Sequence, residues 1–308
     1  MHDVLARPRS LALFCGAGAV ALGLAYMLAA GAPARHLVVN LAALILGATA
    51  WLALDRTAAR RIASEGWAVA ALSVPLLLTA LFGMAVDGAS RWMAVGPLNI
   101  QVSLVILPVA IVLYARRPTP VATAGIVLAS VALAAQPDRG MAGALAASML
   151  AVVLVKPSRP AILALAAATL AFGWTLFTPD NLPATPYVDR IFHTAFSAHP
   201  LAGPAVFAGT ALLLAPALTG ARLALDERAA LLAFGGCWAG IVAAAALGHY
   251  PTPLVGYGGS AVLGYLLSAA MLPGGARVTG RQGAPGSRPP SAGELDRETS
   301  ELRAAGLT

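Results

Sequence analysis

The chain has 308 residues, of which 59% are hydrophobic and 11% are charged, and its mean hydropathy is +0.79. Because an ordinary soluble domain carries about a quarter charged residues, this composition excludes a soluble globular protein and indicates a polytopic membrane protein of the all-α class. The formal net charge of +7 does not indicate a nucleic-acid partner, since the arginines lie in short segments between apolar runs.

Apolar runs close to the length that crosses a bilayer as a helix recur along the whole sequence. We expect about ten membrane-spanning helices. They are predicted at residues 10–31, 36–54, 66–86, 99–115, 119–135, 140–156, 159–178, 201–220, 229–248 and 255–273. The first run is too long for the apolar core of a signal peptide and is interpreted as a span.

Basic residues near span ends tend to stay in the cytoplasm, and this rule orients the predicted bundle. With both termini cytoplasmic, only four of the 20 lysines and arginines lie outside: Arg35, Arg91, Arg139 and Arg190. Residues 1–273 then form one membrane domain. Residues 274–308 form a cytoplasmic tail whose Gly, Pro, Ser and Arg content is typical of disorder.

Polar residues gather in four of the predicted outer segments, where charges beside a membrane core are candidates for function. Residues 86–96 read VDGASRWMAVG and lead to NIQVS at 99–103. The other three segments are QPDRG at 136–140, PYVDRIF at 186–192 and PLVGYGGS at 253–260.

These segments resemble, in order, four sequence boxes of the SEDS (FtsW/RodA/SpoVE) family of cell-shape and cell-division proteins. The first matches the family's N-G-A-x-R-W and I-Q-P-S boxes, the second Q-P-D-L-G, the third T-D-F-I-F and the fourth L-P-F-I-S-Y-G-G-S. The resemblance implies a SEDS-type bundle of about ten helices and covers the chain from the third predicted span to the last.

The chain departs from the family at several polar positions. Leu104 and Leu107 stand where the family has a glutamate and a lysine, and Ser197-Ala198 stand where it has two glutamates. Replacing both partners of an ion pair by apolar residues can be neutral for folding. The remaining departures are Arg139 for Leu, Met141 for Thr, Arg190 for Phe and Gly256 for Ser.

SEDS proteins polymerise lipid II at the outer face of the bacterial cytoplasmic membrane, together with a class B penicillin-binding transpeptidase. The resemblance implies that activity, that partner and that multi-pass location. The chemistry requires a carboxylate to take up the proton of an acceptor hydroxyl, and cations to stabilise the departing pyrophosphate. Asp189 is the expected catalytic residue. The expected substrate-binding residues are Arg91, Trp92, Gln101, Ser103, Asp138, Tyr257, Gly258, Gly259 and Ser260.

Other interpretations of these residues remain open. Asp138 is also placed to cap the helix that follows it, and Gly258 and Gly259 are also suited to close packing. His193, His199 and His249 fit no compact metal motif, so no cofactor is indicated, although the chemistry is compatible with a divalent cation. The alternative functions are a non-catalytic SEDS-like scaffold and a transporter of a lipid-linked precursor.

Overall fold

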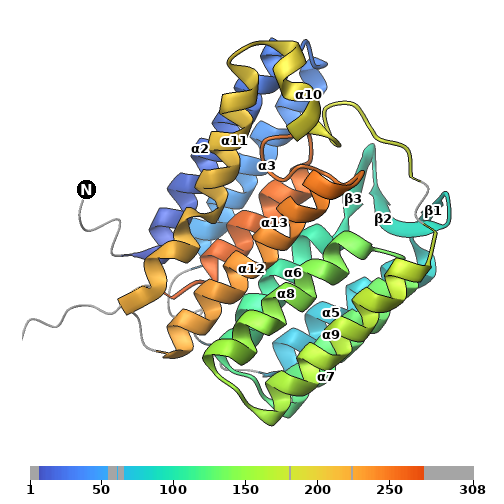
Figure 1. Cartoon of the computed structure of the whole chain (residues 1–308), viewed down its shortest axis with the longest axis vertical. Coiled ribbons are helices and arrows are strands. Elements are labelled where there is room, and N and C mark those ends of the chain that lie inside the picture. The colour runs from blue at the N-terminus through green and yellow to red at the C-terminus, as the bar shows by residue number, and fades with distance from the viewer. Residues whose placement is uncertain (1–6, 55–60, 62–65, 180–181, 223–224, 274–308) are drawn as a thin grey trace, which may run out of the picture. The chain divides into compact units, whose positions relative to one another are not determined.

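The computed structural model describes residues 7–54, 61, 66–179, 182–222 and 225–273. Ten apolar helices dominate these residues, and neighbours in the chain run in opposite directions (Figure 1). They are α2 (Pro8–Ala29), α3 (Ala34–Ala53), α5 (Gly66–Phe82), α6 (Val102–Arg116), α7 (Pro120–Ala135), α8 (Arg139–Val155), α9 (Arg159–Phe177), α11 (Ala202–Leu214), α12 (Leu225–Leu247) and α13 (Gly259–Ala270). A short helix, α10 (Ile191–Ala198), precedes α11, and a 3₁₀ segment, η1 (Ala215–Arg222), follows it.

Each of the ten predicted spans overlaps one of these helices, although several helices are shorter than the predicted span. Four helices are long and apolar enough on their own to cross a bilayer: α2, α3, α9 and residues Glu227–Leu247 of α12. The other six are shorter apolar helices. The chain is a multi-pass membrane protein. The predicted tail, 274–308, lies outside the described residues.

The all-α prediction missed one small sheet, because the helix predicted over 66–86 ends at Phe82 and the helix predicted from 99 begins at Val102. Between them lie three antiparallel strands in the order β1 (Met84–Val86), β2 (Ala89–Val95) and β3 (Leu98–Gln101). The first turn is Asp87-Gly88, both with positive φ, flanked by the pair Val86 and Ala89. An Asp-Gly dipeptide of this conformation is typical of a tight two-residue hairpin.

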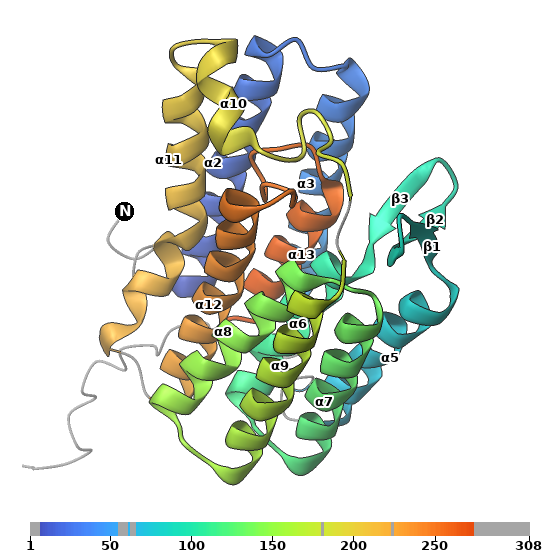
Figure 2. The same cartoon turned by 45° about the vertical axis from the view of Figure 1, so that its right-hand side comes forward.

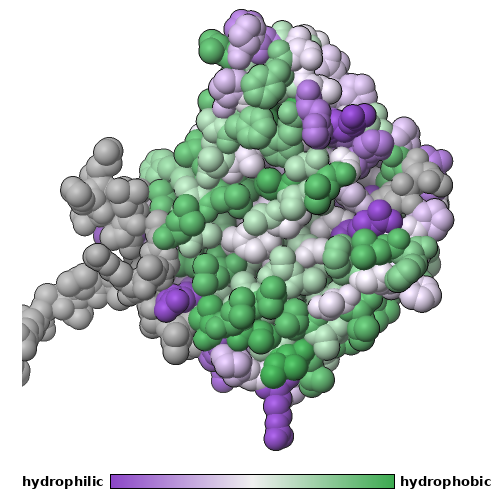
Figure 3. Space-filling model, in the orientation of Figure 1, coloured by the Kyte–Doolittle hydropathy of each residue, from purple (hydrophilic) through white to green (hydrophobic). Residues whose placement is uncertain are grey.

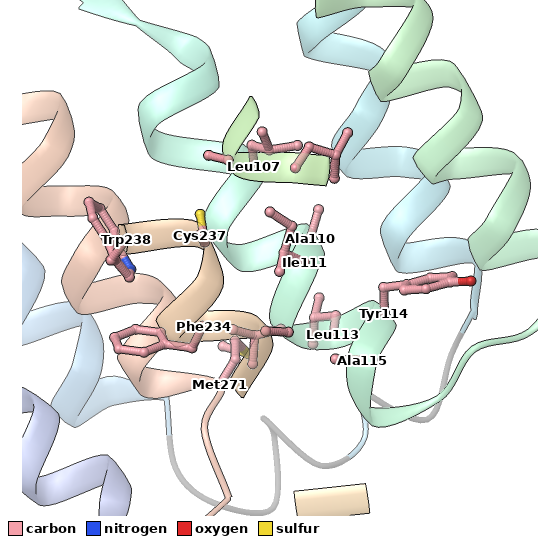
Figure 4. Packing of buried hydrophobic residues seen from close by; sticks show 14 of the residues in the cluster. Leu107, Ala110, Ile111, Leu113, Tyr114, Ala115, Phe234, Cys237, Trp238 and Met271 are labelled. Atoms are coloured by element: carbon pink, nitrogen blue, oxygen red, sulfur yellow. The ribbon is translucent and has the colours of Figure 1, made fainter. Parts of the chain in front are cut away.

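Helix α6 lies at the centre of the bundle, with ten of its 15 residues buried. It packs against α12, α13 and α5, while α12 also packs against α8. Figure 4 shows Cys237 of α12 on the side of that helix nearer Leu107 and Ile111 of α6, and Trp238 of α12 farther from them. Trp238 meets Tyr265 of α13 edge to face, with ring centroids 5.1 Å apart. These contacts bring the middle of the described chain and its last two helices into one core.

The outward-facing surface is largely apolar, as Figure 3 shows for one face. Leu154, Leu170, Phe177 and Leu247 are among its most exposed hydrophobic side chains. Such exposure is costly in water and favourable in lipid, which agrees with a membrane-embedded bundle.

Arginines close the carbonyl ends of helices at the predicted cytoplasmic side. Arg9 donates to the carbonyls of Trp51 and Leu54 at the end of α3, and Arg116 donates to the Met271 carbonyl just after α13, at 2.6 Å. The last carbonyls of a helix have no partner within the helix, and a cation there is favoured by the helix dipole. The basic residues that orient the chain therefore also cap its helices.

Glycines allow the closest helix contacts. A side chain at Gly240 of α12 would lie 2.6 Å from the Cα of Ala144 in α8, and one at Gly264 of α13 would overlap the Leu104 carbonyl oxygen of α6. Small residues serve this purpose between membrane helices. The spacing of Gly236 and Gly240 thus serves packing against α8.

We predict that Gly264→Ala lowers the free energy of unfolding by about 1–3 kcal/mol, because the backbone of α6 has to move to admit the methyl group. Gly173→Ala is the matched control, since a side chain there meets no atom within 4 Å. Its effect stays below about 1 kcal/mol. Thermal unfolding of the two detergent-solubilised variants checks the difference, and equal melting temperatures would contradict it.

Candidate functional site

A buried polar network joins four elements at the predicted outer ends of the helices. The Asp138 carboxylate is fully buried and accepts hydrogen bonds from the Ser103 hydroxyl at 2.8 Å and the Gln101 amide at 3.2 Å. Its other oxygen accepts from the backbone N–H of Met141 and caps α8. The Gln101 backbone N–H donates to the Ser260 hydroxyl. This network therefore fixes β3, α6, α8 and α13 to one another.

Arg91 lies beside this network on the buried face of β2. Its guanidinium donates to the Pro137 carbonyl, one residue before Asp138, and lies 5.6 Å from the centroid of the Tyr250 ring. The side chain is only 2% exposed. Buried arginine is stable where carbonyls and aromatic rings replace its hydration.

Trp92 follows Arg91 in β2, so its side chain leaves the opposite face of the strand. It is half-buried, and its Cα is paired with those of Gln101 and Met84 in the neighbouring strands. The structure thus separates Trp92 from the buried network to which Arg91 points.

Asp189 lies in the segment between α9 and α10, where it forms an isolated antiparallel bridge with Pro251. One carboxylate oxygen, Oδ2, accepts the backbone N–H of Thr185 at 2.8 Å. The other, Oδ1, is buried and has no hydrogen-bond partner among the residues that the structure describes. A buried acceptor without a partner is uncommon and marks a candidate for chemistry.

The pKa of the Asp189 carboxyl is raised above its ordinary value, mainly because burial disfavours the charged form. The Thr185 N–H and the charges of His249 and Arg91 oppose this rise. Arg91 therefore influences both carboxylates, since it donates to the Pro137 carbonyl next to Asp138 and its charge lowers the pKa of Asp189.

Residues 251–258 connect this carboxylate to the last helix. Thr252 donates its backbone N–H to the Val188 carbonyl at 2.9 Å, and Tyr257 donates to the Tyr187 carbonyl at 2.7 Å. Gly258 is the N-cap of α13 and Gly259 its first residue. Figure 2 shows the two segments side by side near the start of α13.

A small pocket lies where these parts meet, between the Asp138 network and Tyr250. Its empty volume is about 230 Å³, part of it open to the surroundings. Its lining is Gln101, Leu104, Asp138, Gly140, Met141, Ile241, Ala244, Tyr250 and Pro251. The structure thus brings Asp138, Gln101 and Tyr250 to one place.

The residues that depart from the family pattern take structural positions here. Leu104 and Leu107 are buried in the core, and Leu104 also lines the pocket. Arg139 donates to the carbonyls of Thr175 and Thr178 and caps α9, whereas Ser197 and Ala198 are exposed on α10. Gly256 approaches the segment before α10, since a side chain there would lie 3.1 Å from the Tyr187 carbonyl oxygen.

The three outer histidines have separate partners. His193 bonds the Ala246 carbonyl, His249 bonds the Leu182 carbonyl, and His199 accepts the N–H of Leu201. Among the described residues, no three His, Cys, Asp or Glu side chains are grouped so that they could hold a metal ion. Asp138 uses both of its oxygens in hydrogen bonds within the protein.

The site contains residues that were not singled out from the sequence. Tyr250 packs against Arg91, while Asn40 and His36 of α3 contact the segment before α13. His36 and Asn40 stand four residues apart within an apolar run, which places them on one helix face. This spacing of two polar residues on one face of an apolar helix is the sequence feature that could have identified them.

No family model and no curated protein sequence matches the chain. The structure is similar to the crystal structure of the rod shape-determining protein RodA of Thermus thermophilus, with a TM-score of 0.60 and 21% sequence identity, over 85% of this chain and 94% of that chain. An aspartate-to-alanine mutant of that RodA matches with a TM-score of 0.59 and 22% sequence identity, over 85% of this chain and 94% of the mutant chain. A chain from a peptidoglycan synthase complex that coordinates polymerization and crosslinking matches with a TM-score of 0.60 and 22% sequence identity, over 85% of this chain and 95% of that chain. The chain therefore has the fold of RodA, a SEDS protein, and the resemblance seen in its four sequence boxes is confirmed at the level of the fold.

Proposed function

We propose that the chain is a peptidoglycan glycosyltransferase that polymerises lipid II at the outer face of the bacterial cytoplasmic membrane, in cell division or cell-shape maintenance. The RodA fold and the similarity to a chain of a peptidoglycan synthase complex support this proposal. The observation that carries it is Asp189, whose Oδ1 is buried and without a hydrogen-bond partner among the described residues.

In the proposed reaction, a sugar hydroxyl of the acceptor attacks the anomeric carbon of the donor. A new C–O bond forms, and the bond to undecaprenyl pyrophosphate breaks, with the electron pair leaving on the pyrophosphate. Asp189 accepts the hydroxyl proton through Oδ1, while the Thr185 N–H holds Oδ2. A carboxylate whose pKa is raised by burial is a stronger base than an ordinary aspartate.

Two arginines supply positive charge in this proposal. Arg91 is buried and favours the charged form of Asp189. Arg190 is exposed, follows Asp189 directly and stands at the start of α10, where it can reach the departing pyrophosphate. Arginine suits this contact because its guanidinium forms paired hydrogen bonds with phosphate oxygens.

The remaining predicted residues divide by their hydrogen bonds. Gln101, Ser103, Asp138 and Ser260 hold the outer ends of the helices together under the site. Trp92 and Tyr257 are half-buried and are proposed to contact sugar or lipid, and Gly258 and Gly259 form the entry to α13. The proposed macromolecular partner is a class B transpeptidase, and lipid surrounds the apolar faces.

A non-catalytic scaffold is the second candidate function. It is favoured by Leu104 and Leu107, which pack in the core where the resemblance implies an ion pair. A scaffold binds the transpeptidase without using Asp189. Normal growth of a deletion strain that carries Asp189→Ala would support the scaffold.

We predict that Asp189→Asn lowers lipid II polymerisation by about 10²–10⁴-fold, because the amide cannot accept the hydroxyl proton. The measurement uses purified full-length protein, fluorescent lipid II and a class B transpeptidase. Asp87→Asn is the matched control, since Asp87 is an exposed outer acid in the hairpin turn, and it retains activity. Full activity of Asp189→Asn, or no polymer from the wild type, would overturn the proposed function.

The raised pKa of Asp189 sets the pH dependence of this activity. Because the proton acceptor is the carboxylate, activity falls as the pH drops through that pKa, and it falls at a higher pH than for an ordinary aspartate. His249→Gln removes a charge that lowers this pKa, so the acidic limb moves to higher pH. His199→Gln is the control, since His199 accepts a hydrogen bond from Leu201 in its own loop. An identical dependence of activity on pH in the two variants would contradict the assignment of Asp189 as the base.

We also predict that Arg190→Gln weakens the use of lipid II more than Arg190→Lys does, because lysine keeps the charge beside the pyrophosphate. The ratio kcat/KM falls by about 10-fold for the glutamine variant. Equal values for the two variants would remove Arg190 from the proposed site.

A further inference from the structure

Helix α3 contacts the rest of the bundle through a narrow stripe of buried residues. Its buried residues are His36, Asn40, Ala43 and Gly47. Ala43 and Gly47 are small residues that suit packing against α13, whereas His36 and Asn40 are polar and lie toward the N-terminal end of the helix. Polar side chains buried in a membrane helix are costly, so each requires a partner within the protein.

Asn40 meets that requirement in full. Its side chain is 0% exposed, its Nδ2 donates to the Gly256 carbonyl at 2.8 Å, and its Oδ1 accepts the Gly258 N–H at 3.0 Å. The two bonds also fix the orientation of the amide, because an N–H requires the oxygen and a carbonyl requires the NH₂ group. One side chain therefore holds the backbone on both sides of Tyr257.

His36 contacts the same part of the chain through its ring. It stacks on Tyr257 with centroids 4.0 Å apart and meets Tyr187 edge to face at 5.8 Å. Tyr257 and Tyr187 are the two residues joined by the backbone hydrogen bond between their segments. Helix α3 thus contacts both segments at the point where they are paired.

The backbone pairing of residues 251–257 with residues 187–189 connects Asn40 to Asp189. Residues 251–257 are bonded to Tyr187 and Val188, and Pro251 forms the bridge with Asp189. Gly256 permits this contact, because a side chain there would lie 2.5 Å from the Ile191 side chain and 2.9 Å from the Thr252 carbonyl oxygen. Residues 251–257 are therefore in direct contact with the segment that carries the carboxylate.

We propose that Asn40 is a positioning residue that holds Asp189 in place through residues 251–258, an inference that rests on the proposed function. A leucine side chain has the same branching as asparagine but would leave the Gly256 carbonyl and the Gly258 N–H without their partner. Those groups would then seek other partners, and the segment would shift. An aspartate displaced by about 1 Å loses much of its value as a base.

The test compares Asn40→Leu and Asn40→Asp with the wild type in lipid II polymerisation. Asn40→Leu lowers kcat about 10- to 100-fold and leaves KM nearly unchanged, because the base moves while the lipid contacts remain. Asn40→Asp retains activity within about threefold, since a buried, protonated aspartate keeps the shape and can still donate to Gly256 and accept from Gly258. Equal kcat in Asn40→Leu and the wild type would overturn the proposal.

Thr210→Val is the matched control. Thr210 is also a buried polar residue of a membrane helix, but its hydroxyl bonds only within α11, to the Val206 carbonyl. The variant keeps the wild-type kcat. If Thr210→Val and Asn40→Leu lose kcat equally, the effect is general loss of stability and the proposal fails.

Hydrogen–deuterium exchange on the same full-length proteins separates this inference from the proposed function. Asn40→Leu speeds exchange in peptides that cover residues 185–190 and 251–258, and Thr210→Val speeds it in neither. If wild-type protein makes no polymer, the proposed function fails, and exchange alone then decides the connection. Unchanged exchange over 185–190 in Asn40→Leu would overturn it.

Discussion

The outer face depends on the backbone pairing of residues 187–189 with residues 251–257. Neither segment is helical at these positions, so their N–H and C=O groups need partners that lipid cannot supply. They find them in each other, through Tyr257 to Tyr187 and Thr252 to Val188, and in Asn40 of α3. Because the segment that carries Asp189 is bonded to the segment that begins α13, the carboxylate is held relative to the packed helices despite lying in a long connection.

Asp138 and Asp189 show how partners divide the roles of two carboxylates at one end of a bundle. Asp138 is fully buried, and its oxygens accept hydrogen bonds from the Ser103 hydroxyl, the Gln101 amide and the Met141 backbone N–H. Asp189 keeps one oxygen without a partner among the described residues. Arg91 affects both carboxylates. It donates to the Pro137 carbonyl next to Asp138, and its charge lowers the pKa of Asp189. The first carboxylate stabilises the fold, and the second is the one for which we propose a chemical role.

The spans were predictable because run length in a membrane is dictated by bilayer thickness. The hairpin was predictable in part, since Asp87-Gly88 is a turn signal, but the surrounding apolar residues extend the neighbouring helix patterns and obscured the strands. The cap formed by Asp138 followed from its position before α8. The contact of Asn40 with Gly256 spans 216 residues, and no local pattern reveals the partner of a polar residue at that separation.

Leu104 and Leu107 place apolar side chains where the family resemblance implies an ion pair. Leu104 lines the pocket beside Asp138, and Leu107 lies deeper in the core. Neither side chain can accept or donate a proton. Asp189, by contrast, is only partly buried and lies in an outer connection. In the proposed reaction, the proton is taken up at Asp189 in this outer connection, so the proposed chemistry needs no charged pair at positions 104 and 107 inside the bundle.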